Sequence, residues 1–526
     1  MDQILLYDTT LRDGTQGENI SFTVEDKLRI SQRLDDIGIH FIEGGWPGSN
    51  PRDLQFFKLA KKTKFKNAEL TAFSATRKPG ISAKKDDNLK ALLESETGVV
   101  TIFGKTWDLH VKEVMNNSLE ENIAMIHDSV FWLKENGRKV IYDAEHFFDG
   151  YFADRQYALK TLTTAFEGGA DTLVLCDTNG GTLPFDIERI TQDVMKTLNE
   201  KFDKHSVKIG IHTHNDCGLA LANSISAVRE GAVMVQGTIN GYGERCGNAD
   251  LTSIIPVLKL KMKYDCISDE NLKKLRKLSR FVSERANMTP SNTRPFVGRS
   301  AFAHKGGIHV SAIAKTPLAY EHICPEMVGN KQRVLVSDLS GKSNVEYKAK
   351  ELGIDLTSDE FNTQEIVTEV KRLEQEGYQF DAADGSLHIL IEKFTNQFSP
   401  SFELKSFRVT VEKNADRPCH SHAMIKISVD GKDEITAAEG HGPVSALDNA
   451  LRKALTSFYP SLDLMHLVDF KVRVIDGRDG TSAKVRVLIE SRDEDKIWST
   501  VGVSEDIIDA SWQALTDSFH FKISNE

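Results

Sequence analysis

Apolar runs alternate with helix-period segments through the first half of the chain. Eight short apolar runs bounded by polar turns predict buried strands near residues 3–8, 39–44, 69–75, 98–103, 139–144, 171–176, 207–213 and 233–239. Segments between them, such as 23–37 and 122–136, carry the spacing of amphipathic helices. Repeated strand–helix units place the chain in the α/β class.

The number of these units predicts the architecture of the first domain. Eight strand–helix units in a row favour a closed parallel (β/α)8 barrel, or TIM barrel, over an open sheet, at about the 250 residues typical of that fold. We therefore expect a catalytic barrel over residues 1–265.

The pattern changes twice after the barrel. Residues 266–395 contain a charged helical stretch at 269–285 and a Gly/His-containing segment at 302–309, which predicts small helical linker subdomains. Residues 396–526 read as strand, strand, helix, twice over, which predicts a separate α+β module. The expected strands lie at 406–411, 423–429, 469–475 and 483–490, and the expected helices at 444–457 and 507–519.

Unusual polar residues follow several of the predicted barrel strands. Arg12 and Asp13 come after the first strand, His212 and His214 end the seventh, and Asn248 follows the eighth. Barrel enzymes carry their reactive groups on the loops at the C-terminal ends of the strands. Since the first, seventh and eighth strands are neighbours in a closed barrel, we expect these side chains to converge.

The two histidines are spaced to act together. Alternate side chains of a strand share a face, so His212 and His214 point the same way. With the Asp13 carboxylate and the Asn248 amide oxygen they would form an open divalent-cation site suited to Zn, Mn or Co, and less clearly to Mg. The alternative is that these histidines are ordinary core or surface residues.

A cation in this position indicates a class of substrate. It could hold a 2-oxo acid through the keto oxygen and the carboxylate, and polarise the carbonyl group. Arg12 would supply a fixed positive charge for the oxygen that becomes negative. The alternative role for Arg12 is a structural ion pair.

Composition and charge exclude several classes of protein. With 66 basic and 77 acidic residues, the formal net charge is −11, and there is no long basic run, so a nucleic-acid partner is not expected. No apolar stretch approaches the roughly 20 residues that span a bilayer, and no signal segment opens the chain, which predicts a cytoplasmic protein without a membrane partner. The six cysteines form no C-x-x-C pair, so we expect reduced thiols, mostly buried.

Three motifs together resemble one enzyme family. They are DTTLRDG at 8–14, HTHND at 212–216 and GYGERCGNA at 241–249, and they are similar to the isopropylmalate, homocitrate and citramalate synthase family. The resemblance extends through GIH at 307–309 and GHGPV at 440–444, and so covers nearly the whole chain. It implies a metal-dependent acyltransferase that condenses acetyl-CoA with a 2-oxo acid.

The same resemblance implies roles for individual residues. Asp13, His212, His214 and Asn248 would hold the metal, Arg12 the enolate or keto oxygen, Thr178 the acceptor carboxylate, and Glu145, His309 and Tyr320 would serve proton transfer, with Glu145 as the base. A salt bridge remains the alternative role for Glu145, and simple packing for Tyr320.

The acceptor acid is indicated by the segment EGGWPGSNPRD at 43–53. It is most similar to the citramalate synthase branch of the family, whose acceptor is pyruvate and whose product leads to isoleucine. Asp143 departs from the aromatic residue of some pyruvate-specific relatives, so we expect it in a differently built acceptor pocket.

The C-terminal module resembles the regulatory domain of the family. The resemblance implies a homodimerising, feedback-inhibited domain whose effector for this branch is isoleucine. The turn at Gly440 and Gly442 could offer backbone N–H groups to the effector carboxylate, or could simply begin a helix.

Three other functions remain open at the level of sequence. A sister synthase would use 2-oxoisovalerate or 2-oxoglutarate with the same fold and metal chemistry. A lyase or aldolase on the same barrel would cleave the carbon–carbon bond. A non-enzymatic sensor would bind an amino acid through residues 402–526.

Overall fold

A computed structural model describes residues 3–203, 207–354, 356, 362–395, 397–413, 415, 418–475, 483–494 and 496–525. The chain divides into two compact units, Met1–Phe302 with Ile323–Lys331 and Ala303–His322 with Gln332–Glu526. Each unit is described by itself.

Unit 1 is a closed barrel of eight parallel strands in sequence order, which confirms the predicted fold class. The strands are β1 (Leu5–Asp8), β2 (Phe41–Gly45), β3 (Glu69–Ala75), β4 (Val99–Lys105), β5 (Lys139–Glu145), β6 (Thr172–Asp177), β7 (Ile209–Thr213) and β8 (Met234–Gly237). Pairing of β1 with β8, from Leu5 opposite Met234 to Asp8 opposite Gly237, closes the ring.

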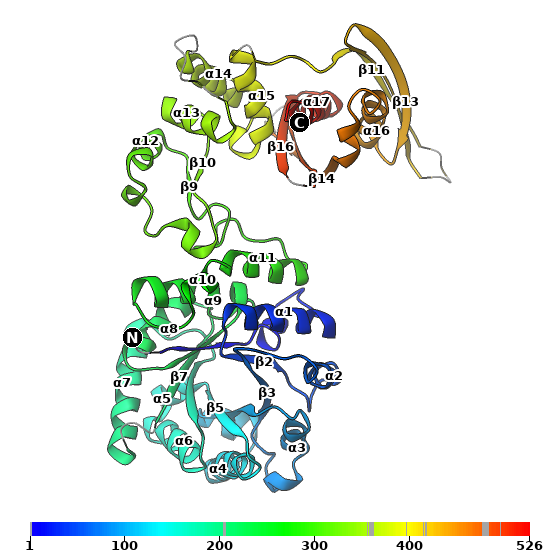
Figure 1. The fold of residues 1–526 in the computed structure, drawn as a ribbon. Coiled ribbons are helices and arrows are strands. Elements are labelled where there is room, and N and C mark those ends of the chain that lie inside the picture. The colour runs from blue at the N-terminus through cyan, green and yellow to red at the C-terminus, as the bar shows by residue number, and fades with distance from the viewer. Residues whose placement is uncertain are drawn as a thin grey trace. The chain divides into compact units, whose positions relative to one another are not determined.

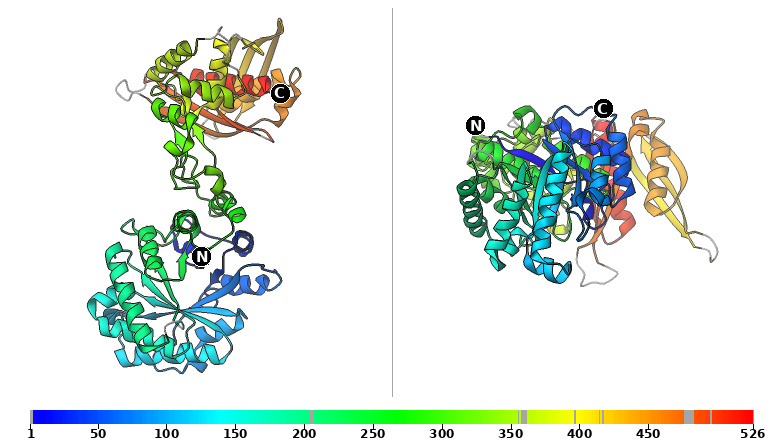
Figure 2. Two further views of the ribbon diagram at one scale, coloured as in Figure 1. Left: turned by 60° about the vertical axis from the view of Figure 1, so that its left-hand side comes forward. Right: turned by 90° about the horizontal axis from the view of Figure 1, so that it is seen from below.

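Helices cover the outside of the barrel strands (Figures 1 and 2). They are α1 (Val24–Ile37), α2 (Pro51–Ala60), α3 (Asp87–Glu94), α4 (Leu119–Glu135), α5 (Phe147–Ala153), α6 (Arg155–Glu167), α7 (Pro184–Lys201), α8 (Ala220–Arg229) and α9 (Leu251–Pro256), followed by α10 (Asp269–Leu272) and α11 (Leu275–Arg285). The main core lies between the helices and the strands, and a smaller cluster that includes Tyr7, Phe41, Val99 and Met234 fills the barrel interior. The interior is therefore packed, as is usual for this fold.

Helix α4 begins three residues before its predicted start at Asn122. Ser118 caps it, because its side chain accepts a hydrogen bond from the Glu121 backbone N–H. The first turn is mainly acidic, so the apolar periodicity begins only after the helix has started. The predicted helical stretch at 269–285 is divided into two helices, α10 and α11.

In unit 2, a short parallel pair, β9 (Ala303–His304) and β10 (Arg333–Val334), accompanies α12 (Gly307–Lys315), α13 (Lys342–Glu351), α14 (Thr363–Glu376) and α15 (Asp384–Phe394). The predicted linker is therefore shared between the two units. The boundaries at 265/266 and 395/396 stay a prediction, and Asn396 lies outside the described residues.

The C-terminal module has the predicted two-fold repeat, but each half contains a third strand, so the predicted two strands per half were wrong. The first half has β11 (Glu403–Glu412), β12 (His420–Val429), β13 (Lys432–Gly440) and α16 (Pro443–Leu455). The second has β14 (His466–Val474), β15 (Val485–Arg492), β16 (Ile497–Ser504) and α17 (Ile507–Ser524). Both sheets are antiparallel in sequence order. Strand β13 was missed because charged and small residues at its edge position give no apolar alternation.

Two further expectations can be compared with the structure. No helix among the described residues is long and apolar enough to cross a bilayer. All six cysteines are free thiols, but only Cys176 and Cys266 are buried, so the expectation of mostly buried thiols was wrong.

The capping box of α1 gives a test of local stability. Thr23 accepts a hydrogen bond from the Asp26 backbone N–H, and the Asp26 carboxylate accepts one from the Thr23 backbone N–H. We expect Thr23→Ala to lower the free energy of unfolding by about 1 kcal/mol. A calorimetric melting temperature would measure the change. Thr23→Ser, which keeps the hydroxyl, should melt close to the wild type, and equal losses in both variants would contradict the capping role.

Candidate functional site

An open pocket lies at the C-terminal ends of the barrel strands, where the sequence predicted the chemistry. It contains most of the predicted site residues of the barrel, together with an aromatic wall. Its lining consists of Arg12, Asp13, Gln16, Trp46, Phe73, Phe103, Asp143, Glu145, Cys176, Thr178, His212, His214, Glu244 and Arg245. Strand geometry therefore brings together side chains as far apart in sequence as Arg12 and Arg245.

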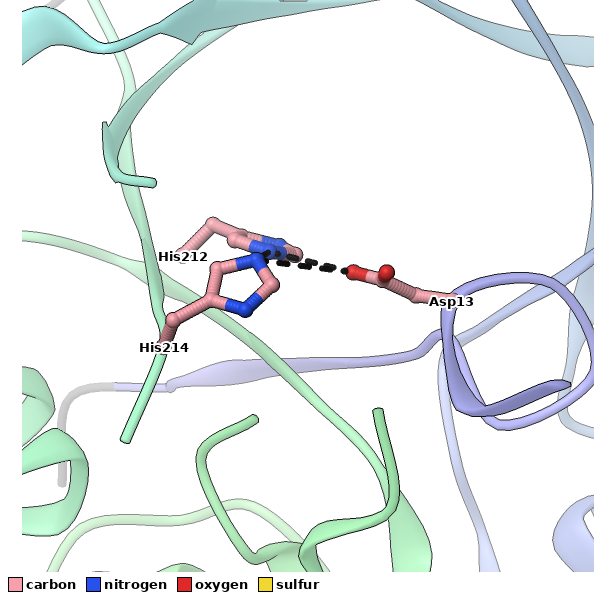
Figure 3. Close-up of side chains that lie close together, drawn as sticks. All are labelled: Asp13, His212 and His214. Atoms are coloured by element: carbon pink, nitrogen blue, oxygen red, sulfur yellow. Dashed lines mark hydrogen bonds and ion pairs between the residues drawn. The ribbon is translucent and has the colours of Figure 1, made fainter. Parts of the chain in front are cut away.

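Asp13, His212 and His214 form a buried cluster on the pocket floor. The two imidazole rings point toward the Asp13 carboxylate across the gap between β7 and the loop after β1 (Figure 3). Asp13 Oδ2 lies 3.3 Å from His212 Nε2 and 4.0 Å from His214 Nε2, and the two Nε2 atoms are 3.3 Å apart. Neighbouring ligands bonded about 2.1 Å from one ion lie roughly 3.0–3.4 Å apart. The two distances that involve His212 Nε2 fall in this range, and the one between Asp13 and His214 is longer.

Asn248 completes this donor set. An antiparallel bridge pairs it with His214, and its side-chain amide lies 2.8 Å from Asp13 Oδ2 and 3.3 Å from His212 Nε2. The amide oxygen is buried and has no hydrogen-bond partner among the described residues. A half-turn of the amide would aim this oxygen at the cluster, since amide O and N are interchangeable in shape. The residues present therefore fit a divalent ion.

The protonation of the cluster follows from its burial and charges. Burial raises the pKa of Asp13, but the Arg12 charge and the hydrogen bond to His212 outweigh it and hold that pKa well below its usual range. Burial lowers the pKa of His212, yet Asp13 raises it further, so the net shift is upward. Burial and the neighbouring His212 lower the pKa of His214 to about 4. An ionised carboxylate and a neutral second imidazole suit cation binding.

Gln236 supports His212 from behind and was missed at the level of sequence. Its Oε1 lies 2.8 Å from His212 Nδ1, and its Nε2 donates to Asp143 Oδ1 at 2.9 Å. The available signal was a polar residue at the inward position of β8, two residues after the interior Met234. Outer hydrogen bonds of this kind fix the orientation of ligating histidines.

Arg12 forms the ion pair that was its alternative role, and it also lines the pocket. Its Nε donates to Glu43 Oε2 at 2.6 Å, and its guanidinium lies 3.8 Å from the ring centre of Phe73. Glu43 is fully buried and also accepts a hydrogen bond from the Tyr7 hydroxyl at 2.8 Å. The ion pair thus fixes the guanidinium at the pocket beside Asp13.

Thr178 and Glu145 lie on neighbouring strand ends at the pocket rim. Thr178 Oγ1 accepts a hydrogen bond from the His146 backbone N–H at 2.8 Å, so the threonine hydroxyl hydrogen can be donated elsewhere. Glu145 forms a salt bridge with Lys105 and still lines the pocket. The structural and the chemical roles considered for Glu145 are therefore compatible.

His309 and Tyr320 belong to unit 2. Their rings stack with centres 4.2 Å apart, His309 in α12 and Tyr320 after Pro317–Ala319. Tyr320 is partly exposed.

Comparisons with known proteins agree with this geometry. The model of the HMGL-like family matches residues 3–282, the homocitrate synthase post-HMGL domain-like model matches 296–378, and the LeuA allosteric (dimerisation) domain model matches 381–522. An (R)-citramalate synthase of Geobacter sulfurreducens is 56% identical over 99% of this chain and 98% of its own length. One of Aquifex aeolicus is 52% identical over 100% of this chain and 98% of its own length.

The chain belongs to the (R)-citramalate synthase family. A probable 2-isopropylmalate synthase of Methanopyrus kandleri is 31% identical over 98% of this chain and 97% of its own length. The citramalate synthase relatives and this more distant synthase thus share the full domain arrangement.

Asp143 provides a pH test within this citramalate synthase site. Burial raises its pKa to about 7, so the folded state holds a proton that the unfolded state loses near pH 4. The wild type therefore loses stability from this group as pH rises from about 4 to 7. We expect Asp143→Asn, without added divalent ions, to unfold at a higher temperature than the wild type above pH 7.

The gain for Asp143→Asn should reach at most about 4 kcal/mol above pH 7 and shrink toward zero near pH 4, at about 1.4 kcal/mol per pKa unit. Thermal unfolding across this pH range measures it. Asp87→Asn, at an exposed carboxylate, is the control. A gain that did not vary with pH would contradict the burial argument.

Proposed function

We propose that this chain is an (R)-citramalate synthase that condenses acetyl-CoA with pyruvate and hydrolyses the thioester to release citramalate and CoA. The observation that carries the proposal is the cluster of Asp13, His212 and His214 beside Arg12 at the barrel mouth. Five relatives named (R)-citramalate synthase are 44–56% identical over at least 98% of the chain, which supports pyruvate as the acceptor.

Sequence identity distinguishes the acceptor branches only at the higher values. Two 2-isopropylmalate synthases are 30% and 31% identical to the chain, and an archaeal (R)-citramalate synthase is 32% identical. Identity near a third is therefore shared by both activities. The match of residues 381–522 to an allosteric (dimerisation) domain supports a synthase over a lyase.

Asp13, His212, His214 and Asn248 are the residues that would hold the divalent ion, whether Zn, Mn, Co or Mg. When bound, such an ion would act as a Lewis acid that polarises the keto group of the acceptor. Gln236 holds the His212 ring in place for this role.

Three residues would bind and orient the acceptor acid. Arg12, fixed by Glu43, would stabilise the negative charge that develops on oxygen. Thr178 would donate its hydroxyl hydrogen to the acceptor carboxylate, because its oxygen already accepts from His146. Asp143 would lie beside the acceptor, and its raised pKa limits the negative charge near that anion.

Glu145 would act as the base. The methyl group of acetyl-CoA is a weak carbon acid, so its proton must move to a carboxylate while the thioester oxygen is stabilised. The resulting carbanion equivalent attacks the keto carbon, and water then hydrolyses the thioester. His309 and Tyr320 would assist this proton transfer from the linker.

Residues of the C-terminal module would supply regulation. We place isoleucine there as the feedback effector and expect a cytoplasmic homodimer assembled through this module. The match to an allosteric (dimerisation) domain supports this assignment. Gly442 stands at the N-cap of α16, where backbone N–H groups could meet the effector carboxylate.

The acceptor assignment predicts a specific kinetic order. With acetyl-CoA and a divalent ion, pyruvate should give a higher kcat/KM than 2-oxoisovalerate or 2-oxoglutarate. Release of free CoA, detected with a thiol reagent, measures turnover, and chromatography identifies citramalate. A higher kcat/KM with either larger acid would contradict the acceptor, while cleavage of added citramalate without net synthesis would favour the lyase.

The metal cluster predicts the effect of removing one histidine. We expect His212→Ala to weaken divalent-ion binding by more than about 100-fold, because even outer partners of metal ligands typically contribute 10–100-fold. Calorimetric titration with Zn or Mn measures the affinity directly. His127→Ala, at a half-exposed histidine on α4, is the matched control. Unchanged affinity in His212→Ala would refute the ligand set.

A further inference from the structure

A buried ion pair outside the pocket holds the end of β2 and the following residue, Trp46, which forms part of the pocket wall. Lys27 of α1 and Asp53 of α2 are both at least 94% buried at the side chain, and Lys27 Nζ lies 2.5 Å from Asp53 Oδ1. Lys27 Nζ also donates to the Gly44 carbonyl at 3.0 Å, and Asp53 Oδ2 accepts from the Trp46 backbone N–H at 2.9 Å. The two charges therefore hold both ends of the Gly44–Trp46 segment, in which β2 ends.

The backbone of this segment leaves room for the Asp53 carboxylate. Gly45 has a φ of 143°, and a side-chain Cβ at this position would lie 2.3 Å from Asp53 Cγ. Only glycine allows the carboxylate to approach so closely. The conformation of Gly45 and the position of the ion pair therefore depend on each other.

Trp46, at the end of this segment, belongs to an aromatic wall of the pocket. The Trp46 ring meets Phe73 at 5.7 Å and Phe103 at 5.8 Å between ring centres, both edge-on, and all three rings line the pocket. Phe73 lies in turn under the Arg12 guanidinium. A shift of the Trp46 backbone would therefore change the free space beside the residue that faces the acceptor.

We propose that Lys27 and Asp53 are positioning residues that hold Trp46 against Phe73 and Phe103 and so limit the size of the acceptor side chain. The proposal rests on the proposed function, in which the pocket takes a 2-oxo acid. Burying two charges is expensive, and well-packed apolar residues would often serve stability equally well. The hydrogen bonds that Lys27 donates to the Gly44 carbonyl and that Asp53 accepts from the Trp46 N–H supply a reason for the pair beyond stability.

The test replaces both charges by apolar groups of similar size. We expect Lys27→Met/Asp53→Leu to remain folded but to lose selectivity, measured as the ratio of kcat/KM for the preferred 2-oxo acid to that for the acid one methylene longer. The ratio should fall about 10-fold, which lies within the range by which one methylene group changes discrimination in an apolar pocket. KM for the preferred acid should rise more than kcat falls.

A control pair of the same residue types, partly exposed, lies on the opposite rim of the same barrel. Lys134 pairs with Asp171 at 2.8 Å, and Asp171 also accepts a backbone hydrogen bond, from Val140 at 2.7 Å. Lys134→Met/Asp171→Leu should leave the selectivity ratio unchanged. An equal fall in both double variants would show a general loss of stability and would overturn the proposal.

Two further variants keep the test decisive if the first one folds poorly. Lys27→Met/Asp53→Asn retains an oxygen for the Trp46 N–H and should restore most of the selectivity. Trp46→Phe should lower the ratio by itself, and adding it to the double variant should cause little further loss, since both changes act through one ring. Independent, multiplying losses would overturn the proposal.

The wild-type measurement separates this proposal from the proposed function. If the wild type prefers a 2-oxo acid other than pyruvate, the acceptor assignment fails, and the ratio is then taken from that acid. An unchanged ratio in Lys27→Met/Asp53→Leu overturns the positioning role alone.

Discussion

Closure of the barrel between β1 and β8 is the constraint on which the site depends. The parallel pairing of Leu5–Asp8 with Met234–Gly237 brings the loop after β1 next to the end of β7 and the loop after β8. Asp13 and Asn248, separated by 235 positions, meet only because the ring closes. An open sheet with the same strands would leave the two on opposite edges, and the cluster could not form.

Much of this arrangement could be predicted from the sequence because it follows from local patterns. Eight apolar runs gave the barrel strands to within a few residues, and the alternation of His212 and His214 gave two side chains on one face. The edge strand β13 escaped prediction, since residues such as Asp433 and Glu434 give no apolar alternation. Strand β16 was also missed, although it is largely apolar and buried. Packing decides which polar side chains pair across strands. The pairing of Gln236 with His212 and that of Lys105 with Glu145 therefore became visible only in the structure.

The pocket is surrounded by buried charged groups whose burial is costly. Glu43, Lys27 and Asp53 are almost completely buried. Such groups are tolerated only when hydrogen bonds and opposite charges compensate for lost hydration. Here the compensation comes from neighbouring strands and turns, so each charge fixes the position of another group. Burying these groups costs stability, and it keeps the polar atoms around the site in a rigid arrangement.

The single amide of Gln236 has a consequence for the chemistry of the neighbouring imidazole. The amide NH2 group of Gln236 donates to Asp143 Oδ1, so the amide oxygen faces His212 Nδ1. A neutral His212 ring must then carry its hydrogen on Nδ1, which leaves the lone pair of Nε2 directed toward Asp13 and His214. The protein has thereby selected one tautomer in advance, and the ring can ligate without first exchanging its proton between nitrogens.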